Sequence, residues 1–117
     1  MLLIWYPKCS TCQKAKRFLE ENEIAFETRD IKEARLSAEE LRRLWTRSGL
    51  PLKRLFNTSG LKYKELGLKD RLPEMGEAEQ IALLASDGML VKRPLLAGDS
   101  FVLAGFRESE WRNRLGI

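Results

Sequence analysis

The sequence predicts an α/β fold in which helices flank a small mixed sheet, and three observations support this prediction. An apolar run, Leu2–Tyr6, is followed at once by a helical pattern and then by a second extended segment, which is the order of a βαβ unit. Helical periodicity fills the middle of the chain. Two further short apolar runs around a glycine-containing turn and a final helical segment complete the pattern. A chain of 117 residues suits one domain with a single core.

The first helix is expected from Thr11 to about Glu21. Ser10, followed three residues later by Gln13, has the pattern of a capping box. Residues with helical spacing form one apolar face of this segment: Cys12, Ala15, Phe18 and Leu19. Cys12 is therefore expected on the inward face, whereas Cys9 precedes the helix at its exposed end.

The segment Ile24–Ile31 is typical of a second strand, parallel to the first because a helix connects the two. Ser37 and Glu40 form another capping-box pattern and begin the next helix. Helical patterns then continue, with interruptions, until Asp87-Gly88.

Met89–Val91 and Phe101–Leu103 are expected to be short strands joined as a hairpin across Ala97–Ser100. A helix over Glu108–Leu115 follows. Two parallel strands plus a hairpin, flanked by helices, make a thioredoxin-like fold with a mixed four-stranded sheet. We expect its core at about residues 1–36 and 86–117, with the helical stretch at about 37–85 as an inserted subdomain.

Composition limits the classes of function. A hydrophobic content of 44% and a charged content of 32% are typical of a soluble globular protein. No apolar run approaches the roughly 20 residues that a membrane helix needs, and the N-terminal run is too short for a signal peptide. We therefore expect a cytoplasmic protein that does not contact membranes, and we expect it to be a monomer.

The net charge of +4 would allow contact with nucleic acid, but lysines and arginines are spread over several segments and mixed with acidic residues. We interpret them as solvated helix faces, compatible with acidic protein surfaces or anionic substrates, and expect no direct nucleic-acid binding. The absence of histidine excludes Ser-His and Cys-His hydrolases. Two cysteines cannot complete a four-ligand zinc site within one chain, so no metal is expected unless two copies share one.

Cys9 and Cys12 are the only cysteines, and they lie in a Cys-X-X-Cys motif between a strand and a helix, which is the setting of thiol–disulfide exchange. Free amides at the helix start, those of Thr11 and Cys12, would favour a thiolate at Cys9, and Lys8 adds a neighbouring positive charge. We expect Cys9 to be the nucleophile and Cys12 the resolving thiol. The alternative is a pair of inert core cysteines.

Arg93-Pro94 is the second candidate feature, because the proline interrupts the strand pattern that ends at Lys92. Thioredoxin-fold proteins carry a cis-proline here that faces the cysteine pair. Arg93 would then lie near Cys9 and supply a cation for its thiolate or for a bound anion. The alternative is an ordinary edge-strand proline with a trans bond.

The chain resembles the arsenate reductase-related family, which includes glutaredoxin-linked arsenate reductases, the Spx and MgsR regulators and YffB/YusI-type proteins, and it looks most like the last branch. The segments that carry the resemblance are Tyr6–Cys12, Asn57–Gly60 with Tyr63 and Glu65–Leu68, Lys92–Leu95, and Gly105-Phe106. The resemblance implies the thioredoxin-like fold with an inserted helical subdomain.

Two departures from the arsenate reductases matter. Cys12 stands where those enzymes normally have serine. Of their three oxyanion-binding arginines, Arg93 and Arg107 match two, but the third falls near Asn57. We therefore do not expect arsenate to be the main substrate. The cysteine pair instead resembles the redox switch of Spx, which binds the C-terminal domain of the RNA polymerase α subunit near a glycine matched by Gly49.

The sequence thus supports two hypotheses. The first is a thiol–disulfide oxidoreductase that holds no bound cofactor, acts on glutathione or protein disulfides, and takes glutathione as a co-substrate. Its anion- or substrate-binding residues would be Lys8, Arg93, Pro94 and Arg107. The second is an Spx-like, redox-sensing transcriptional regulator that binds the RNA polymerase α subunit.

Overall fold

The computed structural model describes residues 1–117, which form an elongated body of 42 × 27 × 24 Å. The elements up to the middle of the chain are β1 (Leu2–Trp5), α1 (Ser10–Glu21), β2 (Glu27–Asp30), α2 (Ala38–Ser48), the 3-10 helix η1 (Leu52–Leu55) and α3 (Leu61–Glu65). The remaining elements are α4 (Leu68–Arg71), η2 (Leu72–Glu74), α5 (Glu77–Ser86), η3 (Gly88–Leu90), β3 (Leu95–Ala97), β4 (Val102–Ala104) and α6 (Glu108–Leu115). None of the helices is both long enough and apolar enough to cross a membrane.

The four strands form one mixed sheet in the order β2-β1-β3-β4. β1 pairs in parallel with β2, and the β1–β3 and β3–β4 pairs are antiparallel. Leu3 of β1 lies opposite Thr28 on one side and Leu96 on the other. This arrangement confirms the predicted thioredoxin-like α/β fold with a mixed four-stranded sheet.

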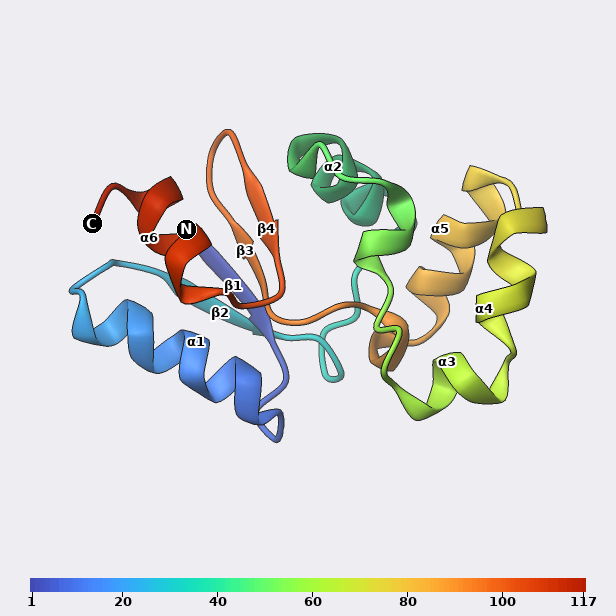
Figure 1. Ribbon diagram of the computed structural model, residues 1–117, viewed down its shortest axis with the longest axis horizontal. Coiled ribbons are helices and arrows are strands. Elements are labelled where there is room, and N and C mark those ends of the chain that lie inside the picture. Colours follow the sequence, from blue (N-terminus) through green and yellow to red (C-terminus); the bar gives the residue numbers. More distant parts are fainter.

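Two apolar clusters lie on the two faces of the sheet. Leu3 and Leu96 point to the face covered by α1 and α6, where Phe18 and Trp111 join them. Successive strand residues alternate between faces, and the opposite face packs against residues from α2 to α5. Figure 1 shows α1 and α6 beside the sheet at one end of the molecule and α3, α4 and α5 at the other end, with α2 between them.

Helix α1 begins one residue earlier than predicted, and its cap differs. Cys9 is the N-cap, with an extended backbone, and Ser10 is already helical, so the predicted capping box at Ser10 is wrong. The reason is a tight turn in which the Cys9 amide donates to the Tyr6 carbonyl over 2.9 Å. The Gln13 side chain donates to the Pro7 carbonyl instead, at 2.7 Å. The thiol of Cys9 therefore lies beside the free amides of the first helical turn.

The capping box at Ser37 is confirmed: the Ser37 hydroxyl accepts from the Glu40 amide and the Glu40 carboxylate accepts from the Ser37 amide. The second strand is shorter than expected, because the chain still turns at Ile24, whose amide donates to the Leu19 carbonyl. Pairing with β1 starts only at Glu27.

The predicted strand at Met89–Val91 is wrong. Residues Gly88–Leu90 form η3, whose first turn is capped by the Asp87 carboxylate accepting from the Met89 amide at 2.8 Å. A short apolar run fits a buried turn as well as a buried strand, and here the close approach of Gly88 to the Ile31 carbonyl holds a turn. The hairpin strand is β3, which starts just after Pro94 and connects to β4 through Gly98–Phe101.

Candidate active site

The cysteine pair lies at the N-terminal end of α1, where the helix meets the end of β1. Cys9 is half-buried and opens to solvent, whereas Cys12, on the first helical turn, is fully buried. Both thiols are free in this structure. The predicted asymmetry in exposure between the two cysteines is therefore present.

The local environment favours the thiolate of Cys9. Burial raises the pKa of the Cys9 thiol, but hydrogen bonds from the Cys12 amide and thiol, the positive charge of Arg93 and the Thr11 amide together lower that pKa below its ordinary value. Amides of a first helical turn have no partner within the helix, so they are free to stabilise an anion at the N-cap.

The environment of Cys12 has the opposite effect. Burial raises the pKa of Cys12 to about 12, and the hydrogen bond with Cys9 and the charge of Cys9 act in the same direction. The Tyr6 backbone and Arg93 lower this pKa, but each does so by less than burial raises it. The thiolate is thus favoured at Cys9, and Cys12 remains a thiol while its neighbour carries the negative charge.

Arg93 reaches this pair from the segment before β3. The Arg93–Pro94 bond is cis, as predicted. The guanidinium stacks over the Tyr6 ring at 5.4 Å, and Nη1 donates to the Met89 carbonyl at 3.3 Å. The Nε atom is buried and has no hydrogen-bond partner. Arg93 is therefore held in place with its Nε donor unpaired, and its positive charge acts on both thiols.

Cys9 opens into a cavity of about 380 Å³. Its polar lining includes four cationic side chains, Arg54, Lys92, Arg93 and Arg107, and no carboxylate. None of the four forms an ion pair within the protein. The remaining lining residues are Thr11, Asn57, Ser59, Ala104, Gly105 and Phe106. A cavity with this charge, next to a sulfur whose pKa is lowered, suits an anionic ligand.

Lys92 is held at this cavity by close backbone packing. Its amide donates to the Leu55 carbonyl at 2.7 Å, which ties the segment before Arg93 to η1. Its side chain passes over Gly105, where a Cβ atom would lie 3.0 Å from the Lys92 Cε. Gly105 also has a φ of +77°, a conformation that favours glycine.

The structure brings together only part of the predicted site. Cys9, Arg93 and Arg107 line the cavity, whereas Pro94 is buried and Lys8 is exposed outside it. Arg54 and Lys92 were missed. The sequence offered a signal for Lys92, since it directly precedes Arg93 in a family motif. It offered none for Arg54, whose position depends on the packing of η1.

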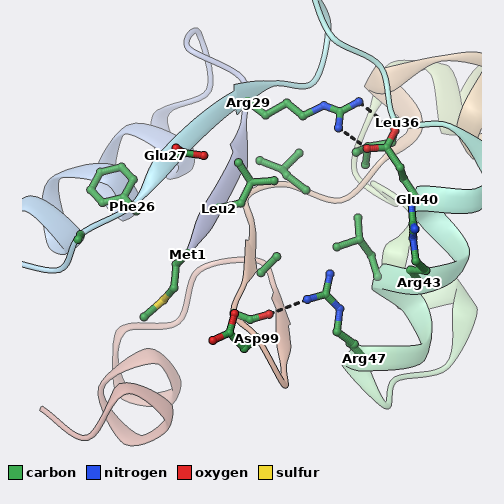
Figure 2. A pocket seen from close by; sticks show the side chains of 15 residues that line it. Met1, Leu2, Phe26, Glu27, Arg29, Leu36, Glu40, Arg43, Arg47 and Asp99 are labelled. Atoms are coloured by element: carbon green, nitrogen blue, oxygen red, sulfur yellow. Dashed lines mark hydrogen bonds and ion pairs between the residues drawn. The ribbon is translucent and has the colours of Figure 1, made fainter.

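A larger cleft of about 620 Å³ lies at the other end of the sheet, between β2, the β3–β4 turn and α2. Figure 2 shows Arg29 directed at the carboxylate of Glu40 across this cleft, and Arg47 also bridges it by donating to the Gly98 carbonyl. The hydrogen bond from Arg29 lowers the pKa of Glu40 to about 2. These polar groups satisfy one another and no cysteine lies among them, so the cleft is not a second redox site.

Metal-ligating side chains do not cluster elsewhere: no group of three or more His, Cys, Asp or Glu residues is placed to hold a metal ion. The candidate chemistry of the molecule is therefore concentrated at Cys9, Cys12 and the cationic cavity.

Known proteins resemble this chain in sequence and in structure. A sequence model of the ArsC family matches residues 4–114. The chain belongs to the ArsC family. The match spans both cysteines and all four cations of the cavity.

Individual relatives of this ArsC-family chain include an uncharacterized protein and a transcriptional regulator. It is 53% identical to the uncharacterized protein YusI of Bacillus subtilis over 92% of this chain and 91% of YusI. It is 28% identical to the global transcriptional regulator Spx of Enterococcus faecalis over 93% of this chain and 81% of Spx. The crystal structure of an ArsC-family-related protein from Bacteroides fragilis is 54% identical, with a TM-score of 0.92 over 96% of this chain and 94% of that chain.

Proposed function

We propose that the protein is a cytoplasmic thiol–disulfide oxidoreductase that acts on anionic disulfides. The observation that carries this proposal is the position of Cys9, at the N-cap of α1 and open to a cavity that contains four unpaired cations and no carboxylate. The thiolate of Cys9 is favoured, whereas Cys12 stays protonated, which is the division of labour that a dithiol mechanism needs.

The reaction begins when the Cys9 thiolate attacks one sulfur of the substrate disulfide. A mixed disulfide forms between Cys9 and that sulfur, and the other half of the substrate leaves as a thiolate. Cys12 then gives up its proton and attacks the sulfur of Cys9, which releases the remaining half as a thiol and leaves a Cys9–Cys12 disulfide. Two electrons pass from the protein to the substrate, and two molecules of a thiol such as glutathione restore the dithiol.

Cys9 loses its negative charge when the mixed disulfide forms. Because that charge is one of the causes that raise the pKa of Cys12, the pKa of Cys12 then falls. The resolving thiol thus becomes easier to deprotonate only after the mixed disulfide has formed. This order protects the free enzyme from losing the Cys12 proton prematurely.

The cations favour glutathione-containing disulfides as substrates. Glutathione carries two carboxylates, and each charge-assisted hydrogen bond to a cationic side chain contributes about 1.5–3 kcal/mol when it is well formed. Arg54, Lys92 and Arg107 line the cavity without carboxylate partners, so they are free to bind these groups. Arg93 is assigned to the thiolate.

A small oxyanion is a less suitable substrate, and of the two departures expected to matter, Cys12 is the one that supports this. Asn57 lines the cavity as a neutral amide, yet Arg54 and Lys92 line it too, so the cavity does not lack positive charge. The obstacle is Cys12: it can resolve an adduct on Cys9 internally before an external thiol intercepts it.

A second candidate function is a redox-sensing transcriptional regulator. The observation that favours it is the 28% identity to Spx over 93% of this chain. In this proposal, formation of the Cys9–Cys12 disulfide changes the affinity for the C-terminal domain of the RNA polymerase α subunit.

The experiment that tests the first function compares two disulfides in single-turnover reactions of the reduced protein. One is a glutathione mixed disulfide and the other is the uncharged bis(2-hydroxyethyl) disulfide. We expect faster reduction of the anionic substrate, an advantage that shrinks with added salt, and a loss of that advantage in Arg54→Gln. A protein that reduces neither disulfide, but binds the isolated α-subunit domain in one redox state only, would favour the regulator.

A further inference from the structure

The cavity at Cys9 continues into a second hollow that the proposed reaction does not use. This hollow has a volume of about 190 Å³ and shares Arg54 and Ala104 with the cavity at Cys9. Its other walls include Leu50, just after α2, and Arg114 on α6. Together the two hollows form a groove that leads from Cys9 along β4 toward Arg114, and we call this the β4 groove.

The β4 groove lies at the outer edge of the sheet, because β4 is the last strand in the sheet order. Helix α2 packs against β4, and Val102 and Leu103 are buried, so the accessible part of this strand is Ala104. Gly105 donates to the Pro94 carbonyl and Gly98 donates to the Phe101 carbonyl, so Phe101 and Gly105 turn their backbone groups toward β3. Backbone groups alternate along an antiparallel strand. Those of Ala104 therefore point away from β3, and Ala104 is half-buried and lines both hollows.

Charge extends along the whole β4 groove. Arg54 and Arg114 line the second hollow, with Glu110 as its single carboxylate. Neither arginine forms an ion pair, and the Arg114 guanidinium lies over the Phe101 ring at 5.4 Å. Positive side chains thus continue beyond the space next to Cys9, into the hollow that Ala104 also lines.

We propose that the β4 groove binds an extended acidic segment of a polypeptide substrate, with its disulfide-bonded cysteine at Cys9 and its acidic residues at Arg54 and Arg114. One residue of the segment pairs with the outward backbone groups of Ala104, as in strand addition to a sheet edge. This inference rests on the proposed oxidoreductase function for its chemistry. It extends the substrate class from small thiols to acidic protein disulfides.

The binding test avoids redox chemistry. A fluorescent peptide that reaches both hollows carries serine in place of cysteine and is flanked by Asp and Glu; its matched control carries Asn and Gln. Fluorescence anisotropy should show tighter binding of the acidic peptide, with the preference reduced at high salt. Equal affinity of the two peptides would overturn the proposal.

Two arginines of α6 provide a matched pair of variants. Arg114 lies over Phe101 in the groove, whereas Arg112 lies over Phe18 at 5.0 Å, outside both hollows. Arg114→Ala should weaken the acidic peptide about three- to tenfold, while Arg112→Ala leaves its affinity unchanged. Equal effects of the two substitutions on peptide affinity would show that the β4 groove does not recognise the acidic peptide.

Backbone pairing is tested on the peptide, so that the protein fold is not disturbed. N-methylation at successive positions should weaken binding several-fold at the residue that pairs with Ala104 and not at its two neighbours. A uniform effect along the peptide would exclude strand addition. Reduction of the glutathione mixed disulfide is measured in parallel, so loss of the oxidoreductase function and loss of the groove are seen separately.

Discussion

The indole Nε1 of Trp111 donates a hydrogen bond of 3.0 Å to the carbonyl oxygen of Gly105. Trp111 is fully buried, and the Phe106 ring packs edge-on against it with centroids 4.8 Å apart. Helix α6 thereby fixes the loop through which Phe106 and Arg107 reach the cavity at Cys9. A core side chain on the face opposite the helical segment thus determines part of the proposed substrate site.

Replacing Trp111 by Phe should reduce both stability and selectivity. The variant leaves the buried Gly105 carbonyl without its donor, which costs about 1–3 kcal/mol in the free energy of unfolding, measured by urea denaturation. The released loop should also slow reduction of the glutathione mixed disulfide more than that of the uncharged disulfide.

Trp45→Phe is the matched control, because the Trp45 indole donates to the Leu50 carbonyl at 2.8 Å, away from the Cys9 cavity. Trp45→Phe should lower the free energy of unfolding without changing the ratio between the rates of reduction of the glutathione mixed disulfide and the uncharged disulfide. The same ratio in both variants would contradict the role given to Trp111.

The two cysteines should differ in their effect on turnover. Cys9→Ser should abolish disulfide exchange, whereas Cys12→Ser should attack the substrate normally and then accumulate a stable mixed disulfide, since no resolving thiol remains. Mass spectrometry of the intact protein distinguishes these results. Faster alkylation of Cys12 than of Cys9 at neutral pH would reverse the assignment.

Arg93 should set the reactivity of Cys9. Arg93→Met removes a positive charge that favours the thiolate, so the pKa of Cys9 should rise and its alkylation by iodoacetamide at neutral pH should slow about three- to tenfold. The pH profile of alkylation measures this shift. Lys8→Met serves as the control, since Lys8 is exposed and lies outside the cavity; an equal shift in that variant would show that only overall charge matters.

Arsenate should be a poor substrate of the native protein and a better one of Cys12→Ser. Removing the internal resolving thiol leaves a Cys9 adduct available to glutathione and glutaredoxin. Arsenate-dependent oxidation of NADPH in a coupled assay measures both proteins. Rapid turnover by the native protein would contradict the importance given to Cys12.

Acid should weaken the contact between β2 and α2. Because the pKa of Glu40 is about 2 in the folded protein and about 4.3 in an unfolded chain, its contribution is complete above the higher value and is lost as pH falls toward the lower one. Glu40→Gln should lower the free energy of unfolding by ~1–2 kcal/mol at neutral pH, and the difference from the native protein should shrink below about pH 4.

Glu39→Gln is the control for this pH dependence. Glu39 is its neighbour on α2, and its ion pair with Arg43 is long, at 3.5 Å, and exposed. Exposed ion pairs of this kind contribute little to stability. The free energy of unfolding of Glu39→Gln, measured in urea, should therefore differ from that of the native protein by almost the same amount at every pH. A similar pH dependence in both variants would exclude the Arg29–Glu40 contact as its source.

Much of the fold was predictable because local signals and family motifs agreed. The apolar face of α1 and the capping box at Ser37 depend on residues only a few positions apart, and both are present in the structure. The strand at Leu95–Ala97 was missed because the neighbouring run at Met89–Val91 is equally apolar. Only the approach of Gly88 to Ile31, far away in sequence, decides between them.

The site was predictable to the extent that it depends on local order. Cys9 and Cys12 take their different environments from helical spacing, which the sequence contains. Arg54 enters the cavity only because η1 packs against the segment of Lys92, and no periodicity or spacing reports such a contact. The cation count of the cavity was therefore underestimated.

Sheet residues and residues of α2 to α5 belong to one cluster of 18 buried side chains. Leu95, next to Pro94, is a member, and so are Leu55 and Phe56 beside Arg54. Because neither part keeps an independent apolar interior on that face, heat or urea should melt the helical segment and dismantle the cavity in a single cooperative transition. Protection of the Cys12 thiol from alkylation and the helical signal in far-ultraviolet circular dichroism should then be lost with the same midpoint.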